Sequence, residues 1–169
     1  HFIGVSNWTT QRIEEANKFA EENGMEPIRI SQINYSLAHS SVETFGDNTL
    51  VCMDTKEFRW YKKHDFPVMA FSPQAKGFFA KLAKGDAANN LPEGQYAGPA
   101  NLARLAKVKQ LSEQTGDTPA KITLGYLNSQ PFFVSSVFAV TKLWQLDEDM
   151  EAQDLTYDPK TVAFLENMI

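Results

Sequence analysis

The stretch "FIGVSNWTT", residues 2–10, has the pattern of a β/α unit. Its apolar first part, Phe2–Ser6, predicts a buried strand in which Gly4 marks a close approach between two backbones. The polar pair that follows ends the strand, and Thr9 or Thr10 predicts the start of a helix. Such a unit is typical of the middle of a β/α fold. The chain also lacks an initiator Met, so we expect that His1 is not the natural start.

The same alternation of strand and helix recurs along the chain. It predicts an α/β fold with a parallel sheet and right-handed crossovers, in one domain over residues 1–169. The segment Pro73–Pro99 is expected to be an irregular loop, because it is rich in glycine and proline. Strands are predicted at Phe2–Ser6, Ile28–Asn34, Pro67–Ser72 and Phe132–Val140. Helices are predicted from Thr9 or Thr10 to Gly24, at Thr55–Lys63, at Ala100–Thr115, from Thr118-Pro119, at Leu143–Gln153 and at Asp158–Asn167.

Composition narrows the possible partners. The formal net charge of −5 argues weakly against nucleic acid. No apolar run reaches the ~20 residues that span a bilayer, and no signal peptide is present, so no membrane partner is expected. Cys52 is the only cysteine, which suits a reducing, cytoplasmic location. The three histidines show no metal-ligand spacing, so no metal site is predicted.

Polar residues end three successive predicted strands. In parallel β/α folds, ligands meet the carboxyl ends of the strands. Amide side chains there both donate and accept hydrogen bonds, so they suit a neutral amide such as nicotinamide, and Phe71 would suit stacking on a flat ring. The alternative is that these are ordinary turn and capping residues. The strand-end residues are Ser6, Asn7, Gln32, Asn34, Ser72 and Gln74.

No catalytic acid, base or nucleophile stands out. The chain has neither a nucleophile elbow nor a GxGxxG phosphate loop. The acidic run at 147–151 falls near the start of a predicted helix, where a capping role is the simpler interpretation.

Seven motifs in order resemble the aldo-keto reductases, in particular their bacterial branch. They are "FIGVSNW", "SQINYSL", "LVCMD", "PVMAFSPQAKGFF", "LPEG", "NLARLAKVKQL" and "TPAKITLGYLNSQPF", and together they cover nearly the whole chain. The family fold is a (β/α)8 TIM barrel of about twice this length. The resemblance therefore implies that this chain corresponds to the C-terminal half-barrel, with four parallel strands each followed by a helix.

The resemblance also implies a cofactor site for NADP(H) and no catalytic residues. The family's catalytic Asp, Tyr, Lys and His lie in the first half of the barrel and have no counterpart here; Tyr35 and Tyr61 are not in matching positions. The implied cofactor contacts are Ser6, Asn7 and Gln32 on the nicotinamide amide, Phe71 on its ring, Ser72, Gln74 and Gly77 along the pyrophosphate, and Gln145, Glu148 and Asp149 near adenine.

The end of the family pattern is altered in this chain. Where the family has a basic loop for the 2′-phosphate, this sequence has Ala139-Val140-Thr141, with Lys142 displaced. NADP binding is therefore expected to be weak or lost.

Two functions follow as hypotheses. The first is the C-terminal half of an NADP-dependent oxidoreductase, inactive in carbonyl reduction alone. The second is a stand-alone, non-catalytic half-barrel that self-associates and retains vestigial nucleotide binding; a proteolytic fragment of a longer chain is a third possibility. The expected partner is a second copy or a complementary N-terminal half-barrel, on an inner sheet face that includes Ile30, Met69 and Val137.

Overall fold

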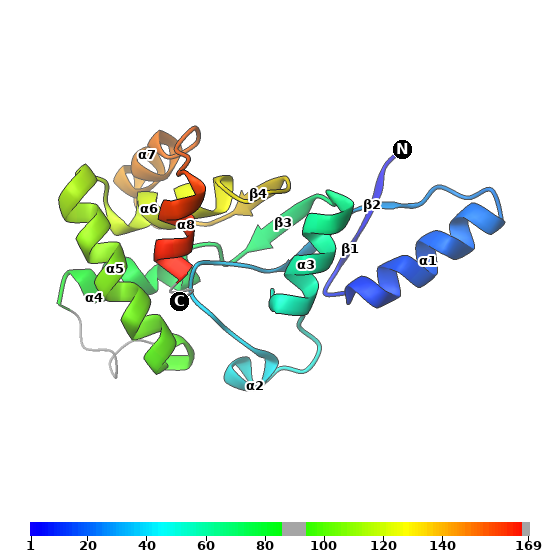
Figure 1. Ribbon diagram of the computed structural model, residues 1–169, viewed down its shortest axis with the longest axis horizontal. Coiled ribbons are helices and arrows are strands. Elements are labelled where there is room, and N and C mark those ends of the chain that lie inside the picture. Colours follow the sequence, from blue (N-terminus) through cyan, green and yellow to red (C-terminus); the bar gives the residue numbers. More distant parts are fainter. Residues whose placement is uncertain (86–93, 167–169) are drawn as a thin grey trace.

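The computed structural model describes residues 1–85 and 94–166. Its sheet contains β1 (Ile3–Ser6), β2 (Ile28–Asn34), β3 (Val68–Phe71) and β4 (Val134–Val137). The four strands are all parallel and lie in the order β1-β2-β3-β4. Helices follow every strand, so the chain forms an open arc with the topology of half a (β/α)8 barrel (Figure 1). The predicted fold class is confirmed.

The helices agree with the sequence pattern except in two regions, and the first is α2 (Val42–Phe45), where no helix was predicted. The predicted irregular segment at Pro73–Pro99 contains the short helix α4, which the sequence analysis missed; residues 86–93 of that segment lie outside the described residues. Phe78, Phe79 and Leu82 bury one side of this helix. The helices are α1 (Thr10–Glu22), α2 (Val42–Phe45), α3 (Thr55–His64), α4 (Phe78–Ala83), α5 (Pro99–Thr115), α6 (Pro119–Asn128), α7 (Leu143–Glu151) and α8 (Pro159–Glu166), with 3-10 turns η1 (Ala75–Gly77) and η3 (Gly94–Tyr96).

Helix starts follow the capping rules. Thr118 Oγ1 accepts a hydrogen bond from the backbone N–H of Lys121, and Pro119 occupies the first helical position of α6. Asp158 Oδ1 likewise accepts from the N–H groups of Lys160 and Thr161 at the start of α8. Both predicted starts are therefore confirmed.

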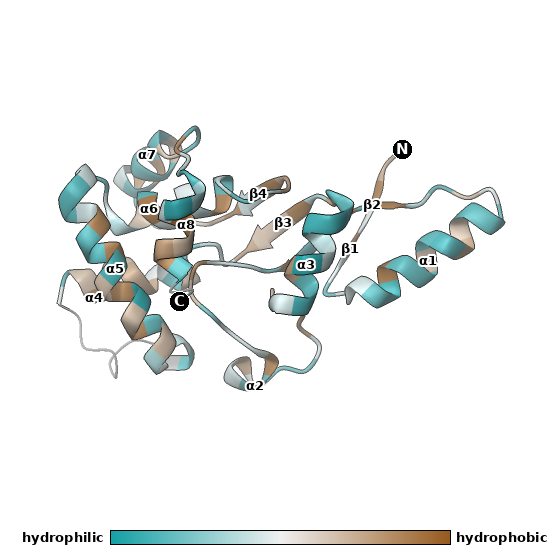
Figure 2. Ribbon diagram, viewed as in Figure 1, coloured by the Kyte–Doolittle hydropathy of each residue, from teal (hydrophilic) through white to brown (hydrophobic). Residues whose placement is uncertain are grey.

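The two faces of the sheet have different environments. On one face, Ile33, Val68 and Ala70 are completely buried against the helices, together with Tyr61 and Ile122. The opposite face is the one that a complete barrel would enclose. The register places Met69 beside Gln32 and Val137 beside Phe71 on this second face, where Met69 is half-buried and Val137 is 39% exposed. Figure 2 shows β3 as an apolar strand, whereas helices α1 and α3 are largely hydrophilic.

The prediction that β1 is buried is wrong for this chain. Phe2, just before β1, is 85% exposed and Ile3 is 47% exposed, because β1 is an edge strand whose only neighbour within the described residues is β2. The close approach at Gly4 is confirmed, since a Cβ there would lie 3.0 Å from the Ile30 carbonyl oxygen and 2.6 Å from Ile30 Cγ2. β4 is the other edge, and it is shorter than the predicted Phe132–Val140.

The terminal helix α8 packs on the helical side rather than over the open sheet face. Its Leu165 is completely buried in the core. Tyr126 on α6 donates a hydrogen bond to Glu166 Oε1 at 2.7 Å, and Arg104 on α5 donates to the Glu166 carbonyl oxygen. The open face therefore stays uncovered by α8.

Candidate functional site

The first part of the candidate site lies at the carboxyl ends of β1, β2 and β3. Asn7 follows β1 in the left-handed conformation (φ 56°), and its backbone N–H donates to the Gln32 carbonyl oxygen at 2.9 Å. Ser6 Oγ donates to Gln32 Oε1 at 3.4 Å. The structure thus brings Ser6, Asn7 and Gln32 together. We call these three residues and Phe71 the strand-end cluster.

Two amide groups of this cluster can still donate hydrogen bonds. Asn7 Oδ1 accepts from the backbone N–H of Val51 at 3.1 Å, which fixes the orientation of the side chain. Within residues 1–85 and 94–166, neither Asn7 Nδ2 nor Gln32 Nε2 has a hydrogen-bond partner. Phe71 lies at the end of β3 on the same sheet face as Gln32 and is half-buried. The cluster therefore presents two N–H donors beside an aromatic ring.

Asn34, the other polar residue at the end of β2, has a structural role. Its Oδ1 accepts from Ser40 Oγ at 2.7 Å, and its Nδ2 donates to the Phe71 carbonyl oxygen at 3.5 Å. Asn34 is 1% exposed. Here the alternative interpretation, an ordinary turn-stabilising residue, is correct.

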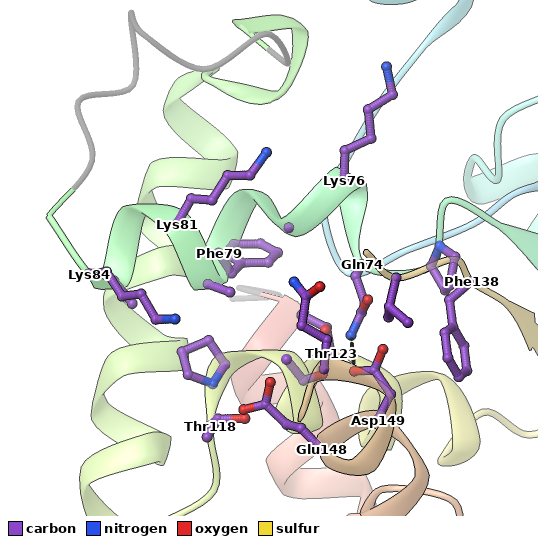
Figure 3. Close-up of a pocket in the computed structure, with 18 of the residues that line it drawn as sticks. Gln74, Lys76, Phe79, Lys81, Lys84, Thr118, Thr123, Phe138, Glu148 and Asp149 are labelled. Atoms are coloured by element: carbon purple, nitrogen blue, oxygen red, sulfur yellow. Dashed lines mark hydrogen bonds between the residues drawn. The ribbon is translucent and has the colours of Figure 1, made fainter. Parts of the chain in front are cut away.

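The second part of the site is a cleft of 1190 Å³ that lies between the segment following β3 and the segment following β4 (Figure 3). α5 and the start of α6 complete its walls. Six predicted site residues line this cleft, and the four residues of the strand-end cluster do not. The six are Ser72, Gln74, Gly77, Gln145, Glu148 and Asp149.

The turn after β3 has unusual backbone geometry. Ser72, Ala75 and Lys76 have φ values of 52°, 49° and 55°, although each carries a Cβ, and Gly77 has φ 80°. Non-glycine residues rarely adopt this region, and clusters of them occur preferentially at functional sites. The turn forms one wall of the cleft.

A partly buried hydrogen bond crosses the cleft. Gln74 Nε2 donates to Asp149 Oδ1 at 2.6 Å, which joins the turn after β3 to α7 (Figure 3). Asp149 is only 4% exposed, and burial raises the pKa of its carboxyl group; the neighbouring charge of Glu148 adds to the increase, whereas the Gln74 hydrogen bond opposes it. Asp149 is therefore a partly desolvated acceptor whose second oxygen lies near the cleft.

The capping interpretation of the acidic run is wrong. α7 begins at Leu143, and its first turn contains no acidic residue. The run falls in the middle and last part of the helix, where Asp149 bonds Gln74 and Glu151 forms an ion pair with Lys121. Asp149 and Glu151 therefore serve tertiary contacts and do not cap the helix.

Gln145 performs the capping role at this helix. Its Oε1 accepts from the backbone N–H groups of Thr141 at 3.1 Å and Lys142 at 3.0 Å. The side-chain oxygen is thus committed to the turn before α7, although the residue still lines the cleft.

Sequence reasoning missed two residues that face each other across the cleft. Lys84 Nζ lies 5.2 Å from the ring centroid of Trp144. In Figure 3, Lys84 extends toward Thr118 and Glu148 on the opposite wall, whereas Lys76 and Lys81 point away from them. A tryptophan near the start of a predicted helix was the available signal, but without the fold nothing related it to a lysine 60 positions earlier.

Comparison with known proteins identifies the class. The family model described as "Aldo/keto reductase family" matches residues 1–169. Because the match covers the whole chain and the strands have the expected order, this chain belongs to the aldo/keto reductase family.

Two curated relatives carry a more particular description. L-glyceraldehyde 3-phosphate reductase from Escherichia coli K12 is 22% identical over 184 aligned residues, and the alignment covers 99% of this chain and 49% of that protein. The protein of the same name from Escherichia coli O157:H7 has the same identity and coverage. This chain therefore spans about half the length of these relatives.

Proposed function

We propose that this chain is the cofactor-binding half of an NADP-dependent aldo-keto reductase-type oxidoreductase, and that it does not reduce carbonyls by itself. One observation carries the proposal. The strand-end cluster includes Phe71 and the cleft begins at the next residue, Ser72, which supports assigning the ten predicted contacts to one cofactor site with two parts. An extended dinucleotide has two ends that suit the two parts of this site.

The strand-end cluster suits a carboxamide. Asn7 Nδ2 and Gln32 Nε2 would donate to the carboxamide oxygen, and the Ser6 hydroxyl or the Gln32 oxygen would accept from its NH2 group. Phe71 would stack on the ring of the nicotinamide. Bound NADPH would supply a hydride; the residues of this chain hold and orient the ring.

The cleft suits a phosphate-bearing ligand, but binding should be weak. Lysines 76, 81, 84 and 109 line it along with Glu113, Glu148 and Asp149, so its net charge is only slightly positive. The family's basic loop for the 2′-phosphate is replaced by Ala139 and Val140, which are cleft residues here. Losing a charge-assisted phosphate contact costs roughly 1.5–3 kcal/mol, about ten- to a hundred-fold in affinity.

The tyrosines of this chain do not suit a catalytic acid. Reduction of a carbonyl needs a proton donor whose pKa lies near the working pH. Burial instead raises the pKa of Tyr61 to about 12, and it also raises the pKa values of Tyr35, Tyr126 and Tyr157. The fifth tyrosine, Tyr96, is completely buried. These environments support the proposal that the catalytic residues of the family have no counterpart in this chain.

A second candidate is a stand-alone, non-catalytic half-barrel that self-associates. The open sheet face around Met69 and Val137 favours it, together with the exposed edge strand at Phe2 and Ile3. A second copy or a complementary N-terminal half-barrel would cover these surfaces. The single cysteine, Cys52, favours a reducing compartment, and we propose the cytoplasm.

A calorimetric titration of NADPH into the purified chain tests the proposal. We expect saturable binding with a dissociation constant in the micromolar range or weaker. Asn7→Ala and Phe71→Ala should remove it, whereas Phe133→Ala, an exposed residue before β4, should leave it unchanged. Sub-micromolar binding, or no saturable binding up to millimolar NADPH, would contradict the proposal.

A further inference from the structure

Trp144 and Lys84 both line the cleft and contact each other. Trp144 is the second residue of α7, and its side chain is 54% exposed although it lines the cleft. Lys84 follows α4 on the other wall, and its ammonium lies 5.2 Å from the indole centroid. This distance is within the ~6 Å range of a cation–π interaction.

Several other polar groups that line the cleft already have partners within the protein. Gln145 Oε1 caps the turn before α7, and Gln74 bonds Asp149. Thr118 Oγ1 caps α6, and Thr123 Oγ1 donates to the Ala120 carbonyl oxygen. The indole face of Trp144 and the ammonium of Lys84 are held to each other only by a weak, solvent-exposed contact. A ligand can therefore separate them at little cost.

We propose that Trp144 is a stacking surface for the base of an adenine nucleotide in this cleft, and that Lys84 leaves the indole to contact the nucleotide's phosphate. This inference rests on the proposed function, because it assigns the base end of the same dinucleotide. It differs from the contacts that the resemblance implies, since neither Trp144 nor Lys84 is among them.

The exchange is chemically reasonable for this ligand class. A purine offers a broad π face, and base–aromatic stacking tolerates the partial exposure of Trp144. A phosphate attracts the Lys84 ammonium more strongly than a neutral indole does, because the phosphate carries a full negative charge whereas the indole offers only a ring quadrupole. Glu148, which also faces the cleft in Figure 3, keeps the region from being strongly cationic, so a bare phosphate is a poorer ligand than a nucleotide.

The test compares NADPH with reduced nicotinamide mononucleotide, which lacks the adenosine part. Trp144→Ala should weaken the binding of NADPH by about ten-fold, the effect of losing one stacked base. It should leave the affinity for the mononucleotide unchanged. Leu143→Ala is the matched control, since Leu143 is 80% exposed on the same turn of α7 and does not line the cleft.

A second pair of variants tests the role of the lysine. Lys84→Gln should weaken NADPH binding and reduce its dependence on salt. Lys107→Gln is the control, because it changes the net charge by the same amount. Lys107 lies 5.0 Å from the ring of Phe164 in a cation–π contact, on the opposite side of α5 from Lys109, which lines the cleft. This control should leave NADPH binding unchanged.

The outcomes separate the two claims. If NADPH binds and Trp144→Ala has no effect, or weakens the mononucleotide equally, the inference is wrong and the proposed function stands. If neither compound binds to the unmodified chain, both are wrong. Selective loss of NADPH affinity in Trp144→Ala and Lys84→Gln, with both controls unchanged, supports the inference.

Discussion

Gln74 Nε2 lies 2.6 Å from Asp149 Oδ1, and this hydrogen bond joins the two walls of the cleft. The two residues are 75 positions apart and belong to the turn after β3 and to α7. Asp149 is almost completely buried and Gln74 is half-buried, so the bond is partly shielded from water. It holds α7 at a fixed distance from the turn with positive φ values.

Asp149→Asn should make the chain more stable at neutral pH. An asparagine keeps the acceptor for Gln74 but removes a buried charge. The pKa of Asp149 is raised in the folded state, mainly by burial, so ionisation costs more free energy in the folded chain than in the unfolded one. The stability of the unmodified chain should therefore fall as pH rises through the folded-state pKa of Asp149.

Urea denaturation of both proteins across acidic to neutral pH measures this effect. The stability gain of Asp149→Asn should vanish below the pKa of an unfolded aspartate and grow as pH increases. Asp147→Asn, which makes the same charge change at an exposed position of α7, is the control and should show no such trend. A gain that does not depend on pH would refute the explanation.

Gly125→Ala should destabilise the chain although it lies within helix α6. Alanine normally stabilises a helix interior by about 1 kcal/mol relative to glycine. A Cβ at Gly125, however, would lie 2.8 Å from Tyr157 Cε2 and 2.9 Å from Leu155 Cγ. Overpacking costs about 1–3 kcal/mol, so we expect a net loss of about 1 kcal/mol in the free energy of unfolding.

Chemical denaturation measures the change in the free energy of unfolding. Ala106→Gly, at an exposed position of α5, gives the effect of helix propensity without a contribution from packing. If Gly125→Ala were more stable than the unmodified chain, the close packing of the segment before α8 against α6 would be contradicted.

The open sheet face should make the chain self-associate in the absence of a complementary half-barrel. Light scattering coupled to size exclusion should give a mass of about twice the 19.0 kDa of one chain. Met69→Glu, on the open face, should shift the mass toward that of one chain. Met25→Glu, at a residue that is 57% exposed away from this face, should not. A mass near 19.0 kDa at micromolar concentration, with a cooperative melt, would refute self-association.

Secondary-structure elements were predicted well where their ends depend only on neighbouring residues in the sequence. The bounds of β2 were predicted correctly at Ile28–Asn34, and the start of α6 followed from Thr118-Pro119. The extent of β4 was overestimated, because an apolar run does not indicate where pairing stops; β4 pairs only with β3, which ends at Phe71. The exposure of Phe2 has a similar cause, since burial depends on a neighbouring strand.

The candidate site was predicted as a set of residues but not as an arrangement. The Gln74–Asp149 bond has no local sequence signal, because it depends on where α7 meets the turn after β3. The capping role of Gln145 has none either, because it depends on how α7 begins. The left-handed conformation of Ser72 and Lys76 was equally hidden, since nothing in their residue types favours it. These features required the tertiary fold.

A carbonyl-reduction assay tests the central claim, that this chain holds the cofactor without a proton donor for catalysis. The purified chain is mixed with an aromatic aldehyde and with NADPH at a concentration that saturates binding. We predict that the nicotinamide absorbance decreases no faster than in a protein-free control. Aldehyde-dependent oxidation of NADPH above that background, abolished by replacing a residue of this chain, would contradict the account.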